Sequence, residues 1–334
     1  MIFLTFIKPF CAILSIIKNH ERKRKQIMGS IVLETRDLSK QYKTQLALNH
    51  VNLRLQQGKI YGLIGKNGAG KTTLMRMIAG LGFPSQGSIY LFGAQNRREL
   101  EAAGKRIGSL IEAPALVAGM SAKENMHLQC LMKGMPNYEI ENELLELVGL
   151  KDTGKKKVKN FSLGMKQRLG IATTLIGNPD LLMLDEPING LDPAGVIEIR
   201  NLIRKLSAYE NKTILISSHN LPELYQAATD FIIIHEGEIR EVLTHEELDD
   251  RCKCYISLEA VNANLLTTVL EEKLHTQNFQ VMPDNSVKLF DFLDERERVG
   301  RILHENDVII TKFSVCETSL EDYFMSVIGG KKNA

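Results

Sequence analysis

The chain has 334 residues, more than a single hydrophobic core usually supports, so its length predicts one large domain and a smaller one. Apolar residues make up 44% of the sequence and charged residues 25%, values that exclude a wholly disordered chain, a collagen and a multi-span membrane protein. The net charge of +2 gives no general indication of nucleic-acid binding.

The first 27 residues differ from the rest in charge. They carry six basic side chains and one acid, a net charge of +5, which leaves −3 for the 307 residues that begin at Met28. Their apolar stretch, MIFLTFIKPFCAILSII, approaches the ~17–25 residues that cross a bilayer, although Lys8 and Pro9 interrupt it. A secretory signal is disfavoured, because the positive charge follows the apolar stretch. A marginal anchor and an upstream extension before a start at Met28 stay open, and we favour the extension.

A phosphate-binding loop is predicted after the apolar run Ile60–Ile64, which is typical of a buried strand. The loop matches G-x-x-x-x-G-K-T and precedes a run, LMRMIAGL, with helical spacing. In such a loop the backbone N–H groups surround the phosphates, the lysine reaches the terminal phosphates and the threonine hydroxyl is available to Mg²⁺. The predicted nucleotide-binding residues here are Gly65, Asn67, Gly68, Ala69, Gly70, Lys71, Thr72 and Thr73.

Two further strands are predicted to end at the same site. Leu181–Leu184 is apolar and precedes Asp185 and Glu186, and the strand Thr213–Ser218 precedes His219. An acid at a strand end beside a phosphate loop can hold Mg²⁺, and its neighbour can polarise an attacking water. We therefore expect Asp185 on the metal side, Glu186 as general base, and His219 near a terminal phosphate.

The segment Asn160–Arg168 carries a family resemblance: with the motifs above, it resembles the ATP-binding subunits of ABC transporters. Ser162 and Gly164 match the second and fourth positions of that family's LSGGQ motif, whereas Leu163 and Met165 depart from it. In the family this motif opens a helix that caps the γ-phosphate held by a second copy, so the resemblance implies a dimer. The resemblance also implies that Tyr42 stacks on adenine. It further implies that Asp192, in the segment NGLD, belongs to the loop that links the two nucleotide sites of the dimer.

Glu112 stands where that family usually carries a glutamine that touches Mg²⁺. This glutamate, with the run SLGMKQRLGIA, resembles the branch that exports bacitracin, lantibiotics and similar peptide antibiotics. The resemblance implies that Glu112 is a metal ligand together with Thr72 and Asp185, and a carboxylate would hold Mg²⁺ more tightly than an amide. Neutral drift is the alternative explanation of this position.

Helical spacing dominates the sequence between Ala115 and Asp180, which contains the motif at Ser162. The resemblance implies that this insert, about residues 113–178, receives a membrane partner. Its basic run, 155–159, would face acidic partner loops or lipid headgroups, or be a solvated loop.

The sequence after Asp249 shows no nucleotide or metal chemistry. Its apolar runs predict the order β-α-β-β-α-β, typical of a ferredoxin-like unit, followed by a terminal helix that ends at Gly329 and Gly330. Cys252 and Cys254 form a C-x-C pair, but no second pair lies at metal-ligand spacing. Five scattered cysteines fit a reducing compartment. Dimer support or regulation is the expected role of this unit.

The predicted fold is α/β: a P-loop NTPase domain of the ABC type, with antiparallel β and helical subdomains, plus a small ferredoxin-like α+β domain. The expected boundaries are an N-terminal extension at 1–27, the ATPase at 28–248 and the accessory domain at 249–334. The expected function is an ATP-hydrolysing subunit that binds ATP and Mg²⁺ and dimerises with a second copy. It would drive a separate membrane permease from the cytoplasmic face of the plasma membrane, for peptide antibiotic efflux or immunity, without nucleic acid as a partner. A soluble or sensing ATPase that is not coupled to transport is the alternative.

Overall fold

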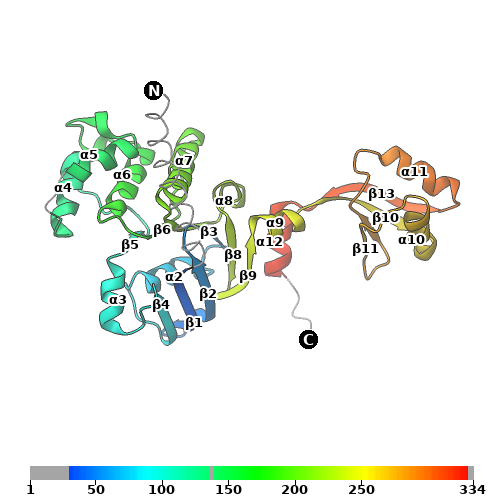
Figure 1. Ribbon diagram of the computed structural model, residues 1–334, viewed down its shortest axis with the longest axis horizontal. Helices are drawn as coiled ribbons and strands as arrows, with labels where there is room; N and C mark the ends of the chain where they lie inside the picture. The colour runs from blue at the N-terminus through cyan, green and yellow to red at the C-terminus, as the bar shows by residue number, and fades with distance from the viewer. Residues whose placement is uncertain (1–29, 136–138, 330–334) are drawn as a thin grey trace, which may run out of the picture. The chain divides into compact units, whose positions relative to one another are not determined.

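The computed structural model describes residues 30–135 and 139–329, and the chain divides into two compact units between His245 and Glu246 (Figure 1). This division lies three residues before the boundary expected at 248 and 249. The N-terminal extension expected at 1–27 lies outside the described residues. Among those that are described, no helix is both long and apolar enough to cross a membrane.

The main sheet of the first unit has a parallel core. Strand β3 lies between β7 and β8, and β6 extends the parallel arrangement beyond β7. Every residue of β3, β6 and β7 is buried, which explains why these strands read as continuous apolar runs. In spatial order the strands are β5 (Ile107–Leu110), β6 (Leu181–Asp185), β7 (Thr213–Ser218), β3 (Ile60–Ile64), β8 (Asp230–His235) and β9 (Glu238–Thr244).

A second, antiparallel sheet contains β1 between β2 and β4, and helix α2 shares a core with both sheets. The buried side chains Leu74, Met75 and Ile78 of α2 belong to one apolar cluster with β1 and β2 residues and with Met183 and Leu215 of the main sheet. The elements are β1 (Ile31–Tyr42), β2 (Gln45–Gln56), β4 (Gln86–Leu91), α2 (Lys71–Ile78) and α3 (Arg97–Gly104). The helix that follows the phosphate loop is therefore fixed by packing along its length.

The region between β5 and β6 is helical, as the spacing predicted. Helix α4 begins at a capping box in which Ser121 and Glu124 each accept a backbone N–H from the other. The backbone N–H of Ser121, and then the Lys157 ammonium, lower the pKa of Glu124 to about 2, so the cap stays ionised at neutral pH. The elements are α4 (Ala122–Met132), α5 (Glu139–Leu147), the 3₁₀ turns Lys151–Thr153 and Val158–Asn160, and α6 (Leu163–Leu175).

Two helices complete the first unit, α7 (Pro193–Glu210) and α8 (Leu221–Ala227). Helix α7 packs against β7, and α8 packs against β3 and β7. The predicted fold class, a P-loop α/β domain with antiparallel and helical subdomains, is confirmed.

The second unit contains a four-stranded antiparallel sheet with the strand order β11-β12-β10-β13. With helices α10 and α11 the chain order is β-α-β-β-α-β, which is the predicted ferredoxin-like arrangement. Helices α10 and α11 supply Leu266, Leu270, Val299 and Leu303 to a core that includes β10 and β12 residues. The elements are α9 (His245–Arg251), β10 (Cys254–Ala260), α10 (Ala263–Glu272), β11 (Phe279–Val281), β12 (Val287–Leu289), α11 (Arg296–Glu305), β13 (Ile310–Glu317) and α12 (Leu320–Gly329).

Candidate nucleotide site

The loop between β3 and α2 has a conformation that requires glycine at two points. Gly70 has φ +110°, and a Cβ there would lie 2.7 Å from the carbonyl oxygen of Ala47 on β2. A Cβ on Gly65 would lie 2.6 Å from the carbonyl oxygen of Ile234 on β8. The loop therefore passes closely between β2 and β8, while Asn67 and Gly68 at its tip are exposed.

Lys71 begins α2, and its ammonium group turns back over the loop. Its Nζ donates to the carbonyl oxygen of Gly65 at 2.7 Å, and the side chain is only 6% exposed. The Nζ also lies 3.6 Å from Oε1 of Glu186, so the phosphate loop and the end of β6 are joined by an ion pair. A cation in this position can exchange these oxygens for phosphate oxygens.

Asp185 is the most enclosed acid of the site, with 5% exposure. Its Oδ2 accepts a hydrogen bond from Thr72 Oγ1 at 2.9 Å, and its Oδ1 accepts one from the hydroxyl of Ser217. The carboxylate therefore connects α2, β6 and β7, as the two strand ends beside the phosphate loop predicted.

Glu186 and His219 lie side by side. His219 Nδ1 is 2.9 Å from Glu186 Oε2, while the backbone N–H of Glu186 donates to Ser217 Oγ at 2.9 Å. Glu186 has φ +50°, an uncommon conformation for a residue with a side chain, and Ser217 holds it there. A cavity of 140 Å³ is bounded by both side chains and by loop 188–191. The predicted base and histidine are thus brought together.

Ser162 and Gly164 begin α6, as expected of a motif that opens a helix. Ser162 Oγ accepts the backbone N–H of Met165 at 3.2 Å. A Cβ on Gly164 would lie 3.8 Å from Leu191, so this helix start lies beside loop 189–192. Asp192 itself caps α7 by accepting the N–H of Gly195 at 3.2 Å. No hydrogen bond within the described parts of this one chain joins Ser162 or Gly164 to the phosphate loop at 65–73.

Tyr42 is exposed at the end of β1, and the Lys40 ammonium lies 4.9 Å from the centre of its ring. Tyr42 pairs with Gln45 of β2. Gln45 lies two residues before Ala47, whose carbonyl oxygen lies close to Gly70. The ring therefore belongs to the part of the β1–β2 hairpin that lies near the phosphate loop.

Glu112 follows β5 and has φ +67°. Its carboxylate forms an ion pair with Arg76 of α2, which lies one helical turn after Thr72. This contact places Glu112 beside α2, where its partner is the Arg76 guanidinium. Its role as a metal ligand stays a prediction.

Ser217 is a residue of the site that sequence reasoning missed. It is fully buried and binds both Asp185 and the backbone of Glu186. The two serines that directly follow the apolar residues 214–216 are the one sequence signal that could have indicated it.

Comparison with known proteins identifies the family. The ABC transporter family profile matches residues 48–189. The bacitracin transport ATP-binding protein BcrA of Bacillus licheniformis is 40% identical over 304 residues, which cover 90% of this chain and 98% of BcrA. This chain belongs to the ABC transporter ATP-binding subunits.

Two further matches describe this ABC subunit's relatives. The lantibiotic transport ATP-binding protein SrtF of Streptococcus pyogenes is 47% identical over 210 residues, which cover 62% of this chain and 89% of SrtF. The dimeric structure of a post-hydrolysis state of the ATP-binding cassette MJ0796, bound to ADP and Pi, is 25% identical. It matches with a TM-score of 0.58 over 64% of this chain and 98% of that one. The chain is an ATP-hydrolysing cassette, and cassettes of this family form dimers.

The oxygens around Asp185 fit a magnesium ion. Magnesium prefers hard oxygen ligands, and here a carboxylate and the Thr72 hydroxyl already lie 2.9 Å apart at the phosphate loop. The donor set therefore suits a site that shares Mg²⁺ with nucleotide phosphates.

Replacing Ser217 by alanine is expected to lower the kcat of ATP hydrolysis by about 10–100-fold, the usual cost of removing a residue that orients a metal ligand. The change removes a hydrogen bond from buried Asp185 and another from Glu186. Steady-state phosphate release measures it. Ser218→Ala is the matched control, because the Ser218 hydroxyl binds the N–H of Asn220 instead. Equal losses in the two variants would contradict the assignment of Ser217.

Proposed function

We propose that this chain is the ATPase subunit of an exporter that removes peptide antibiotics of the bacitracin or lantibiotic type. The observation that carries the proposal is its 40% identity with a bacitracin transport ATP-binding protein over 304 residues. The match is longer than the first unit, so it also includes part of the accessory unit. Cassettes of unrelated function are expected to be less similar in sequence in this second unit.

The phosphate loop binds ATP through its backbone N–H groups and Lys71. The Lys71 ammonium leaves Gly65 and Glu186 and takes the oxygens of the terminal phosphates. This exchange frees the Glu186 carboxylate from its cation at the moment the nucleotide enters. Tyr42 stacks on adenine, for which its exposed ring beside Lys40 is suited.

Thr72 and Asp185 would hold Mg²⁺, with Glu112 joining them after it releases Arg76. When bound, the ion neutralises charge that develops on the transferred phosphoryl group. Glu186 accepts a proton from the attacking water, and His219 orients Glu186 through their 2.9 Å contact. Ser217 keeps both acids in place, because its hydroxyl donates to the Asp185 carboxylate and accepts the backbone N–H of Glu186.

Ser162 and Gly164 act on the nucleotide of a second copy. The start of α6 presents backbone N–H groups and the positive end of the helix, which suit a γ-phosphate. Loop 189–192 packs beside this helix start and ends at the α7 cap, Asp192, so movement at one nucleotide can reach the other. The dimeric cassette matched above supports this arrangement.

The partner that moves substrate is a separate membrane permease, which the chain meets at the cytoplasmic face of the plasma membrane. The helical region between β5 and β6 is the docking surface we assign to it. Leu131 and Met132 on α4 are 54% and 72% exposed there, and the basic run 155–159 lies on the same subdomain.

Glu186→Gln is expected to convert the chain to a stable dimer in saturating Mg·ATP, because binding is retained while the base is lost. Analytical ultracentrifugation measures the change from monomer to dimer mass. Glu236→Gln, at an exposed acid outside the site, is the control and should dimerise only transiently. A Glu186→Gln chain that sediments as a monomer at saturating Mg·ATP would refute the two-copy mechanism.

Co-expression of this chain with its permease is expected to raise the bacitracin or lantibiotic concentration that inhibits growth of a sensitive host. Lys71→Ala should abolish the protection, because phosphate binding is lost. The assay compares a panel of both antibiotic classes with and without the gene pair. Unchanged inhibition across the whole panel would reject antibiotic export and favour a sensing or soluble ATPase.

A further inference from the structure

Strand β13 forms a long free edge of the accessory sheet. Among residues 246–329 its strand neighbour is β10 alone, whereas the opposite edge is formed by β11. Strand β13 has eight residues and β11 has three. Proteins usually keep exposed edges short or protected, so a long free edge indicates a surface that pairs with another strand.

The edge is apolar on the side of the sheet that the helices cover. Phe313 lies opposite Leu258 of β10, and Val315 lies opposite Ile256, and both β10 residues are fully buried in the core. Phe313 and Val315 are nevertheless 38% and 44% exposed. The core layer therefore extends along β13 beyond the helices of its own unit.

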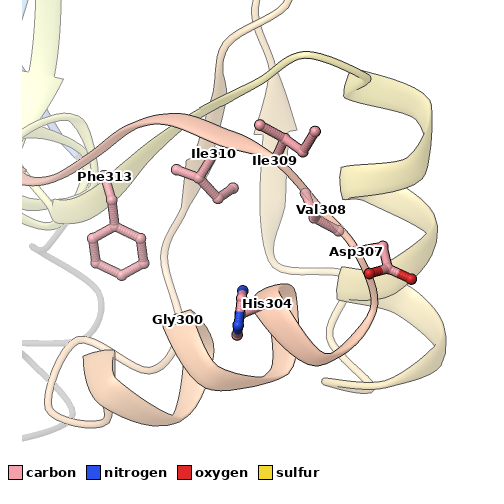
Figure 2. A pocket seen from close by; sticks show the side chains of 7 residues that line it. All are labelled: Gly300, His304, Asp307, Val308, Ile309, Ile310 and Phe313. Carbon is pink, nitrogen blue, oxygen red and sulfur yellow. The ribbon is translucent and has the colours of Figure 1, made fainter.

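A pocket of 580 Å³ continues this apolar surface between β13 and α11. Figure 2 shows the Phe313 ring and the His304 imidazole on the same side of β13, toward α11. Ile309, directly before the strand, is 68% exposed. The groove thus consists of a free backbone edge and an incomplete apolar layer along the same strand.

We propose that β13 pairs antiparallel with β13 of a second copy of this chain, with Ser314 opposite its own counterpart. Around a twofold axis at Ser314, Phe313 of each copy lies opposite Val315 of the other, so two such pairs form, one on either side of the axis. The two sheets become one, and the apolar layer becomes continuous. Lys312, which binds Glu259 of its own unit, then faces Cys316 and meets no like charge.

The sequence of β13 favours a second copy as the occupant. A shift of the axis to Val315 would set Phe313 against Glu317, and a shift to Lys312 would set two ammonium groups together. Of these three registers, only the one at Ser314 gives both Phe313 and Val315 an apolar partner. The proposal rests on the proposed function in one respect: the ATP dimer of the cassettes would hold two accessory units at high effective concentration, so a weak edge contact suffices.

The test is disulfide formation by Ser314→Cys in the full chain, with Cys11, Cys252, Cys254 and Cys316 replaced by serine. Residues directly opposite in an antiparallel pair have Cα atoms about 4.5–5.5 Å apart, within the range of a disulfide. Copper phenanthroline oxidation, with and without Mg·ATP, should give a crosslinked dimer on a non-reducing gel. Gln280→Cys, on the exposed β11 edge, is the matched control and should not crosslink.

Two charged variants test the register. Phe313→Lys sets an ammonium against Val315 of the other copy, and Val315→Glu sets a carboxylate against Phe313, so each should abolish the Ser314→Cys crosslink. The double variant sets lysine opposite glutamate on both sides of the axis and should restore it. A contact that did not use this register would not be rescued.

Crosslinking of Ser314→Cys above the control, in either nucleotide condition, supports the edge pairing. If Ser314→Cys crosslinks no more than Gln280→Cys in both conditions, the edge pairing is overturned. It is also overturned if each charged variant abolishes the crosslink but the double variant does not restore it. Sedimentation of Glu186→Gln combined with Phe313→Lys, which breaks the edge contact, reports separately on the cassette dimer. A chain that dimerises through its cassettes without the crosslink would refute the edge pairing and leave the proposed function intact.

Discussion

The buried carboxylate of Asp185 is the constraint on which the rest of the nucleotide site depends. A charge taken out of water is costly unless hydrogen bonds replace the lost solvation. Here Thr72 and Ser217 each supply one, so α2, β6 and β7 are fixed relative to one another through a single side chain. The position of Glu186 follows, because Ser217 also accepts its backbone N–H.

Two residues near Asp185 have a strained backbone conformation. Glu112 and Glu186 both have positive φ, which costs of order 1–3 kcal/mol for such residues. Each is held by a contact to a neighbouring element, Glu112 by Arg76 and Glu186 by Ser217 and His219. Each acid also has a cationic partner that a nucleotide can displace, Arg76 for Glu112 and Lys71 for Glu186. The site thus combines one rigid acid, Asp185, with two acids whose partners can change.

Local patterns predicted most of the fold, because buried parallel strands and a glycine loop are encoded by adjacent residues. Strands β3, β6 and β7 and the order of the accessory unit were predicted in this way. The meeting of distant strand ends at the phosphate loop followed from its motifs, but other distant side-chain pairs did not: the Arg76–Glu112 pair joins residues 36 apart, and neither residue is unusual alone. Strand β13 continues past the apolar residues 308–310 to Glu317, because residues 314–317 pair with β10.

The affinity for ATP with and without Mg²⁺, measured by calorimetry on Asp185→Asn and Glu186→Gln, tests most directly whether Asp185 is the metal-side acid and Glu186 the base. In the wild-type chain Mg²⁺ should strengthen ATP binding. Glu186→Gln should retain that strengthening, whereas Asp185→Asn should lose it and bind free ATP no more weakly than the wild type. Loss of the Mg²⁺ effect in Glu186→Gln, or its survival in Asp185→Asn, would contradict the separation of roles between the two adjacent acids.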